Sequence, residues 1–322
     1  MKKVILITGI SGEVGFGLAK KLVKLRKYKI VAIDIKKPEG EIFNLLDKFY
    51  TCDITDKVKL EEIFKRENVD AIFHLASILS TGGEKNPELA TKVNVLGTLN
   101  LLEIANLNCI KKNKSIKFMF PSSIASHGTP ITIYGIGKLA CENFGIYYSN
   151  YYKLLDNSLN RKNSIDFRCI RFPGLLSPDT IPSGGTSDYG PEMLHFAAQN
   201  KAYKCFVRPD SKIPFMAMVD AVDILYKLFN SPRTKITRNV YEVAGFSVSA
   251  KEIEEEIKKA FPKAKIGYKI NKERQRIVDS WPKEVSSTYA THDWGYKIKY
   301  GFKETFNDYL IPKIKERYKD TN

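Results

Sequence analysis

The first half of the chain alternates short apolar runs with longer stretches in which apolar residues recur every three or four positions. The apolar runs predict buried strands at 3–8, 29–34, 48–53, 70–76, 116–122 and 166–174. The stretches between them predict helices at 13–26, 56–67, 87–107 and 132–152. Buried strands that alternate with helices are typical of a parallel sheet with helices on both faces. We therefore expect an α/β fold with a doubly wound, Rossmann-type parallel sheet over residues 1–174.

The pattern becomes irregular after residue 174. The segment 177–191, SPDTIPSGGTSDYGP, is rich in Gly, Pro and Ser and predicts a loop. Shorter elements follow, with helices near 218–230, 249–260 and 303–317 and a strand near 239–243. We expect residues 175–322 to form a smaller substrate-binding lobe, with some of its strands returning to the main sheet. The polar stretch 153–164 predicts an exposed insert.

The composition is that of an ordinary globular protein, with 43% hydrophobic and 27% charged residues among 322. Five scattered cysteines without C-x-x-C spacing argue against a disulfide framework or a zinc site, and no histidine shows metal-ligand spacing. Because no stretch approaches the roughly 18 apolar residues of a membrane span, we expect no membrane interaction. A cytoplasmic location is expected; no transit peptide is visible, and a mitochondrial matrix role stays open.

The formal net charge is +16. A strongly basic chain can bind nucleic acid when its cations are concentrated on one face. Here lysines and arginines are spread over the whole length, and lysine outnumbers arginine. The charge therefore predicts a lysine-rich solvated surface and no nucleic-acid partner.

A glycine-rich turn lies between the first predicted strand and the first predicted helix. In ITGISGEVG, Gly9, Gly12 and Gly15 allow a tight turn and a close approach of backbone to a pyrophosphate at the helix N-terminus. Asp34 ends the second predicted strand, where a carboxylate accepts hydrogen bonds from ribose hydroxyls and repels a 2′-phosphate. The pattern predicts a dinucleotide site that favours NAD, although Lys36 and Lys37 leave NADP open.

A tyrosine and a lysine share one face of the helix predicted at 132–152. Tyr134 and Lys138 are four residues apart in ITIYGIGKLACE, which places their Cβ atoms about 5–6 Å apart. An ammonium at that distance lowers the pKa of a phenol and creates a proton acceptor. Taken alone, a tyrosine and a lysine at this spacing usually belong to an ordinary solvated surface.

The glycine spacing together with Y-x-x-x-K after the fifth strand resembles the extended branch of the short-chain dehydrogenase/reductase superfamily. The resemblance implies a catalytic set of Ser123, from PSSIA, with Tyr134 and Lys138. The cofactor-binding residues it implies are Gly9, Gly12, Glu13, Val14, Gly15, Asp34, Asp53, Ile54, Leu75, Ala76, Ser77, Asn94, Tyr134, Lys138 and Pro173.

Motifs later in the chain narrow the resemblance. FRCIRFPGLLS (167–177), GGTSDY (184–189), IPFMAMVDA (213–221), VYEVAGFSVSAKEI (240–253), RQRIVDSWP (274–282), HDWGYK (292–297) and LSTGGEKNPELATKVNV (79–95) are similar to the epimerase-like, NAD-dependent L-threonine 3-dehydrogenases. The substrate-binding residues implied are Ser80, Ser123, Tyr134, Gly185, Thr186 and Trp281. Core packing is the alternative for Trp281, and loop packing is an equal alternative for Asp188 and Tyr189. A homodimer built from the helices at 87–107 and 132–152 is also implied.

The activity that this resemblance implies is oxidation of the L-threonine 3-hydroxyl to 2-amino-3-oxobutanoate, with Tyr134 as general base and NAD as hydride acceptor. Two alternatives remain, a nucleotide-sugar epimerase or dehydratase on the same scaffold and a non-catalytic NAD-binding module. The chain departs from the family because only TPITI separates Gly128 from Tyr134, where the family has a longer segment that walls the substrate site. The insert at 153–164 is a second departure.

Overall fold

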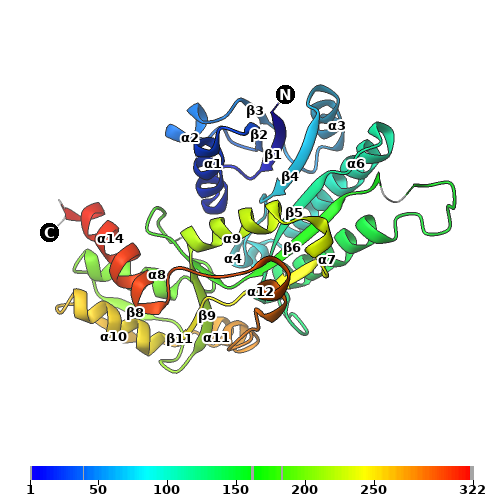
Figure 1. The fold of residues 1–322 in the computed structure, drawn as a ribbon. Coiled ribbons are helices and arrows are strands. Elements are labelled where there is room, and N and C mark those ends of the chain that lie inside the picture. The colour runs from blue at the N-terminus through cyan, green and yellow to red at the C-terminus, as the bar shows by residue number, and fades with distance from the viewer. Residues whose placement is uncertain (1, 39, 161–162, 183, 320–322) are drawn as a thin grey trace.

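The computed structural model describes residues 2–38, 40–160, 163–182 and 184–319, and within them a seven-stranded parallel sheet forms the centre of the molecule (Figure 1). Its strand order is β10-β6-β5-β4-β1-β2-β3. The strands are β1 (Lys3–Thr8), β2 (Tyr28–Asp34), β3 (Lys48–Thr51), β4 (Val69–His74), β5 (Lys117–Ser123), β6 (Asp166–Phe172) and β10 (Val240–Glu242). The order 3-2-1-4-5-6 is that of a Rossmann fold, so the predicted fold class is confirmed.

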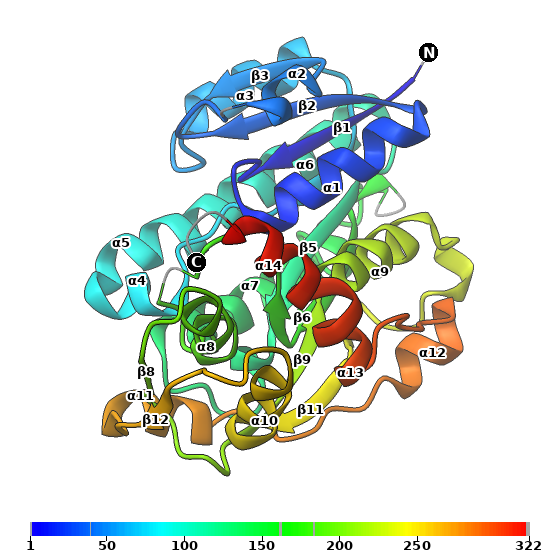
Figure 2. The same cartoon turned by 90° about the vertical axis from the view of Figure 1, so that its left-hand side faces the viewer.

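Helices cover both faces of this sheet, as Figures 1 and 2 show. One face carries α1 (Glu13–Leu25) and α9 (Met218–Asn230), and the other carries α3 (Lys57–Arg66), α6 (Gly97–Lys112) and α7 (Ile133–Asn150). The period-2 alternation of β1 explains the two cores, since Ile5 and Ile7 pack with Leu18 of α1, whereas Val4 and Leu6 pack in the opposite core.

The longest helical stretch differs from its prediction. Instead of one helix at 87–107, the chain forms α5 (Pro87–Ala90), a π-helical turn η1 (Thr91–Leu96) and then α6, so helical structure extends to Lys112. Contrary to the expectation that no stretch approaches a membrane span, Pro87–Lys112 is long and apolar enough to cross one by length and composition. Half of its most apolar window is buried inside the fold, as in the core helix of a globular protein.

The remaining elements build a second lobe beside the sheet. A three-stranded sheet contains β11 (Phe246–Ser249), β9 (Lys212–Ala217) and β7 (Gly174–Leu176), and a two-stranded one contains β12 (Ile266–Tyr268) and β8 (Tyr203–Cys205). The helices are α8 (Tyr189–Ala198), α10 (Ala250–Ala260), α11 (Lys272–Asp279), α12 (Thr288–Trp294), α13 (Phe302–Glu304), η5 (Thr305–Leu310) and α14 (Ile311–Arg317). Phe215, Ile253 and Phe306 are buried in a core of their own.

Some segments of the second half deviate from the sequence pattern. The loop predicted at 177–191 ends early, because α8 begins at Tyr189. β10, by contrast, lies where the sequence predicts a strand near 239–243, and it pairs in parallel with β6 of the main sheet. Short elements complete the chain, namely α2 (Glu41–Asn44), α4 (Ser80–Lys85), η2 (Ile124–Ser126) and η4 (Arg233–Lys235).

The insert after α7 forms turns that project from the body of the molecule (Figure 1). Its predicted range includes residues 161–162, which lie outside the described part of the chain. Within the described part, the side chain of Leu155 is 96% exposed. All five cysteines are buried and unpaired.

Candidate active site

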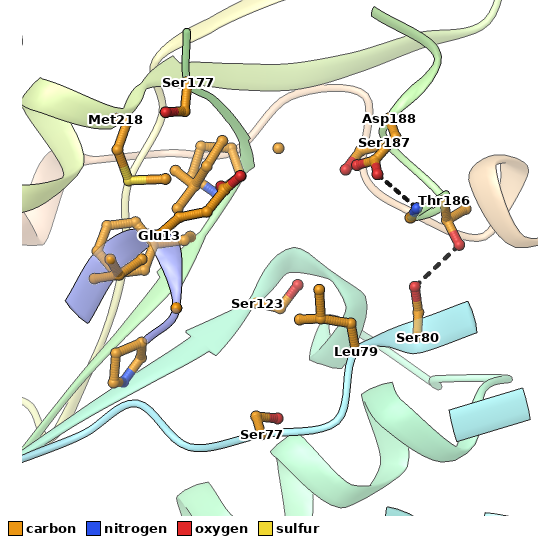
Figure 3. Close-up of a pocket in the computed structure, with 18 of the residues that line it drawn as sticks. Glu13, Ser77, Leu79, Ser80, Ser123, Ser177, Thr186, Ser187, Asp188 and Met218 are labelled. Carbon is orange, nitrogen blue, oxygen red and sulfur yellow. Dashed lines mark hydrogen bonds between the residues drawn. The ribbon is translucent and has the colours of Figure 1, made fainter. Parts of the chain in front are cut away.

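A cavity of about 380 Å³ lies at the carboxyl ends of the central strands, between the sheet and the second lobe. This edge is where open α/β sheets bind their ligands. Residues from both lobes line it, and Figure 3 shows 18 of them. Those predicted from the sequence are Gly9, Gly12, Glu13, Val14, Gly15, Leu75, Ser77, Ser80, Ser123, Tyr134, Lys138, Pro173, Gly185, Thr186 and Trp281.

The glycine-rich turn presents bare backbone to this cavity. Gly9 has a φ of 70°, and a Cβ there would lie 2.6 Å from the amide nitrogen of Ala76. A Cβ at Gly15 would lie 2.7 Å from the carbonyl oxygens of Gly9 and Ile10. Gly12 caps α1 without any side-chain hydrogen bond to its first turn. The turn therefore fits a dinucleotide, because the N-terminal amides of α1 stay available for a diphosphate.

Five residues predicted for the cofactor lie outside the cavity lining, and each has a structural contact. Asp34 ends β2 and its carboxylate accepts hydrogen bonds from the backbone N–H groups of Ser11 at 2.9 Å and Ile35 at 2.8 Å. Asp53 accepts from the N–H of Thr55 at 2.8 Å, and Ile54 is buried. Asp34 is thereby fixed beside the glycine-rich turn. The other two residues are Ala76 and Asn94.

Asn94 and Ala76 fix the segment that follows β4. The side chain of Asn94 accepts a hydrogen bond from the N–H of Ile78 at 2.7 Å and donates one to its carbonyl oxygen at 2.9 Å. The N–H of Ala76 donates to Thr8 Oγ1 at 3.3 Å. These bonds hold the backbone of the segment that contributes Leu75 and Ser77 to the cavity.

His74, a buried residue at the end of β4, links these elements behind the cofactor turn. Thr98 Oγ1 donates to the carbonyl oxygen of Asn94 at 2.6 Å, so it accepts from His74 Nε2, 2.8 Å away. His74 Nδ1 then accepts from Thr8 Oγ1 at 2.7 Å. Burial lowers the pKa of His74 to about 3, with Lys138 adding to the effect. The imidazole is therefore neutral, with its proton on Nε2.

Ser123 is the last residue of β5 and the N-cap of η2. Its Oγ accepts a hydrogen bond from the N–H of Ala125 at 3.1 Å, which leaves the hydroxyl proton free to donate toward the cavity. Figure 3 shows its side chain pointing into the open space. The serine is therefore oriented as a donor.

A buried carboxylate braces the turn that carries Ser123. Glu142, 2% exposed on α7, accepts from Ser122 Oγ at 2.5 Å and Ser126 Oγ at 2.8 Å. Arg171 donates to its other oxygen at 2.6 Å through Nη2. Ionic hydrogen bonds raise the pKa of Arg171 against the opposing effect of burial. Sequence patterns could not indicate this pair, because Glu142 and Arg171 are 29 residues apart along the chain.

Tyr134 and Lys138 lie on the first turns of α7, which begins after the N-cap Thr132. Thr132 Oγ1 accepts from the N–H of Gly135 at 3.1 Å. Lys138 is 7% exposed, and its Nζ donates to the carbonyl oxygen of Pro121 at 2.8 Å. The same Nζ lies 5.7 Å from the centroid of the Tyr134 ring. The ammonium is thus held in place beside the phenol.

The predicted substrate residues meet across the two lobes. Ser80 Oγ lies 3.1 Å from Thr186 Oγ1, and Gly185 N–H donates to Asp188 Oδ2 at 2.6 Å, as Figure 3 shows. Trp281 borders the cavity, and its Nε1 is buried without a hydrogen-bond partner. A buried indole N–H without a partner can donate a hydrogen bond to a ligand that enters the cavity. Of the two alternatives at 188 and 189, Asp188 lines the cavity, whereas the ring of Tyr189 packs against Phe206 and Phe215.

The charge of the cavity is mixed. Among the described residues that line it, Lys138 is the only cation, and Glu13 and Asp188 are carboxylic acids. The side chain of Glu13 accepts a hydrogen bond from Thr180 Oγ1 in the second lobe. Burial is the largest cause that raises the pKa of Glu13, and the carboxylates of Asp188 and Asp179 add to it. Apart from the amides of the glycine-rich turn, the cavity therefore offers more carboxylate acceptors than cationic side chains.

Comparison with known proteins agrees with this geometry. The NAD dependent epimerase/dehydratase family matches residues 5–244. The mitochondrial L-threonine 3-dehydrogenase of Bos taurus is 32% identical over 315 residues, which cover 93% of this chain and 80% of the bovine protein. The X-ray structure of L-threonine dehydrogenase from Clostridium difficile has a TM-score of 0.86 at 34% identity and covers 98% of both chains.

A GalE-like L-threonine dehydrogenase from Cupriavidus necator is similar as well. Its holo form has a TM-score of 0.84 at 30% identity, and its apo form has a TM-score of 0.74 at 27% identity. Each alignment covers 97% of this chain and 99% of the other. The chain belongs to the NAD-dependent epimerase/dehydratase family of extended short-chain dehydrogenases. It is an NAD-dependent oxidoreductase, and NAD is its cofactor.

Proposed function

We propose that the protein oxidises the 3-hydroxyl of L-threonine to give 2-amino-3-oxobutanoate. The observation that carries the proposal is the shared cavity of Ser123, Tyr134 and Lys138 with the glycine-rich turn on one side and the Ser80–Thr186 pair on the other. This arrangement offers a base, a donor to the reacting oxygen and a small polar site within reach of the cofactor turn.

The chemistry follows from the orientation of each side chain. Tyr134 takes the hydroxyl proton as general base. The ammonium of Lys138, fixed by the Pro121 carbonyl, stabilises negative charge on the phenol oxygen. Ser123 donates a hydrogen bond to the substrate oxygen as it becomes a ketone, because its own lone pair is engaged by Ala125. NAD, when bound, supplies the hydride acceptor.

The polar groups of the cavity complement an amino acid. Asp188, which lines the second-lobe side of the cavity, is an acceptor for an ammonium group. The unpartnered indole N–H of Trp281 and the hydroxyl of Thr186 are donors for a carboxylate. An unsatisfied buried donor costs free energy, so a substrate that provides its acceptor gains affinity.

The charge of the site argues against a nucleotide-sugar substrate. Such a substrate carries a second diphosphate besides that of NAD, and a diphosphate that does not lie at a helix N-terminus is usually held by arginine or lysine. Lys138 is the only cation among the described lining residues, and two carboxylic acids face the same space. A non-catalytic NAD-binding module would not require the oriented set of Ser123, Tyr134 and Lys138.

The test is a substrate panel followed by NADH absorbance. Purified protein with NAD is mixed with L-threonine, D-threonine, L-serine or a UDP-sugar, and NADP replaces NAD in a parallel series. The proposal expects NADH formation with L-threonine and NAD, and little with the other pairs. Turnover of the UDP-sugar without net NADH, and none of L-threonine, would establish the epimerase alternative.

We also propose a homodimer formed through α6 and α7. Leu96 and Leu107 on the first helical stretch, and Ile136, Tyr147 and Tyr151 on or next to the second, are exposed apolar or aromatic residues. Their residue exposures range from 43% for Leu107 and Tyr147 to 51% for Leu96. Light scattering coupled to size exclusion is expected to give twice the chain mass of 36.6 kDa. A Leu96→Asp and Ile136→Asp double variant should shift the protein to the monomer, and a monomeric wild type would contradict the proposal.

A further inference from the structure

We propose that Arg274 is a positioning residue that fixes the substrate loop, residues 184–188, and thereby sets the affinity for the amino acid. This inference rests on the proposed function. Arg274 lies on α11, outside the cavity lining, and its side chain reaches the back of the loop. It acts on the site only through the backbone that it holds.

The guanidinium makes two hydrogen bonds to consecutive carbonyl groups. Arg274 Nη2 donates to the carbonyl oxygen of Gly184 at 3.0 Å and to that of Gly185 at 2.6 Å. The centre of the guanidinium lies 3.4 Å from the centroid of the Phe206 ring. A stacked guanidinium with fixed donors is rigid, so it defines the orientation of both peptide planes.

A residue of the Rossmann lobe also binds the loop at residues 184–188. Thr81 Oγ1, on α4, donates to the same Gly184 carbonyl oxygen at 2.7 Å. Ser80, its neighbour, pairs with Thr186 across the cavity edge. The Gly184 carbonyl is thus the point where one donor from each lobe converges, and Gly184 itself has a φ of 87°, which favours glycine.

The direction of these carbonyls determines where the amide hydrogens of the loop point. In a trans peptide the N–H is antiparallel to the C=O of the preceding residue. Because Arg274 binds both carbonyls, the N–H groups of Gly185 and Thr186 point away from the guanidinium. The first donates to Asp188 Oδ2, and this bond orders the carboxylate that lines the cavity. The second belongs to Thr186, whose side chain also lines the cavity.

Arg274 also connects the loop to Trp281. The helix α11 that carries Arg274 ends at Asp279, and Trp281, with its buried, unpartnered Nε1, comes after the C-cap Ser280. The side chain of Arg274 therefore fixes the position of the loop that carries Thr186 and Asp188 relative to the segment that carries the Trp281 indole. Arg274 reaches both carbonyls through Nη2 alone, so the ammonium of a lysine could also donate to both, but it lacks the planar group that stacks on Phe206 and holds the donor in place.

The test compares Arg274→Met and Arg274→Lys with Arg276→Met, which changes an exposed arginine of the same helix. We expect KM for L-threonine to rise about tenfold or more in Arg274→Met, since two charge-assisted hydrogen bonds are lost, and by a smaller factor in Arg274→Lys, which loses the stacking on Phe206. The dissociation constant of NADH should stay unchanged, kcat should change much less than KM, and Arg276→Met should resemble wild type. Amide hydrogen exchange in residues 184–188 should accelerate only in the Arg274 variants.

Thr81→Val provides a second route if the Arg274 variants fold poorly. It removes the other donor to the Gly184 carbonyl and should raise KM by a smaller factor, again with faster exchange in the loop. Unchanged KM and unchanged exchange in folded Arg274 variants, or in Thr81→Val where these do not fold, would overturn the inference. A wild type that does not oxidise L-threonine would refute the proposed function instead. The exchange measurement would still test whether Arg274 holds the loop at residues 184–188.

Discussion

Gly135 lies so close to the carbonyl oxygen of Ala125 that a Cβ atom at position 135 would overlap it. This contact lets the start of α7 pack directly on η2, the turn that follows Ser123. Tyr134 and Ser123 precede the two residues in contact, so the missing side chain brings the proposed base and donor into one cavity.

The Gly135 contact predicts a specific loss of activity. In Gly135→Ala the helix must shift away from η2, and a displacement of about 1 Å at a catalytic group costs roughly a hundredfold in kcat. Overpacking should also lower the free energy of unfolding by about 1–3 kcal/mol. The matched control is Gly137→Ala, where the added Cβ would meet Val95 at 3.4 Å, an ordinary contact. Equal kcat values in the two variants would contradict the account.

Glu13 places a carboxylate at the first helical position of α1, close to the amides that fit a diphosphate. Glu13→Gln removes a like charge, so NAD should bind about threefold to tenfold more tightly. The control Glu284→Gln changes the net charge at a residue outside the cavity lining. Titration calorimetry with NAD measures the effect. An affinity equal to or weaker than that of wild type would contradict a repulsive role for Glu13.

The raised pKa of Glu13 adds a pH dependence to the same binding step. A bound diphosphate raises this pKa further, so binding takes up a proton. Wild-type affinity for NAD should therefore strengthen as the pH falls from neutral toward the raised pKa, while Glu13→Gln should lack this component. Parallel slopes of affinity against pH in the two proteins would show that Glu13 does not titrate with binding.

His74 predicts a loss of stability in mild acid. Its pKa is lowered to about 3 in the folded protein, so between that value and the ordinary value only the unfolded chain binds the proton. The contribution of neutral His74 to the free energy of unfolding is fully present above the pKa of the histidine in the unfolded chain. It decreases as the pH falls below that pKa. Relative to His74→Gln, the wild-type free energy of unfolding should fall by about 2 kcal/mol between about pH 7 and about pH 5. Urea unfolding at the two pH values measures the difference, and a constant difference would contradict the assignment.

The glycine-rich turn, the Tyr134–Lys138 pair and the alternating strands could be predicted because each depends on local patterns of a few residues. The bonds that position them could not. Thr8 meets His74 across 66 positions, and Arg274 meets Gly184 across 90. Such pairs have no periodic signal, because their spacing is set by the crossover connections of the sheet. The start of α8 at Tyr189 is not predicted for a different, local reason, because its first turn lies in a stretch whose Gly, Pro and Ser content favours a loop.

The most direct test of the central claim is the rate of NADH formation from NAD and L-threonine in wild type and Tyr134→Phe. The phenylalanine ring fills the same space but cannot take the hydroxyl proton. The account predicts measurable turnover in wild type, a loss of at least about a hundredfold in kcat in the variant and NADH binding close to that of wild type. Turnover that survives in Tyr134→Phe would contradict the role of Tyr134 as base, and a wild type without L-threonine turnover would contradict the proposed reaction.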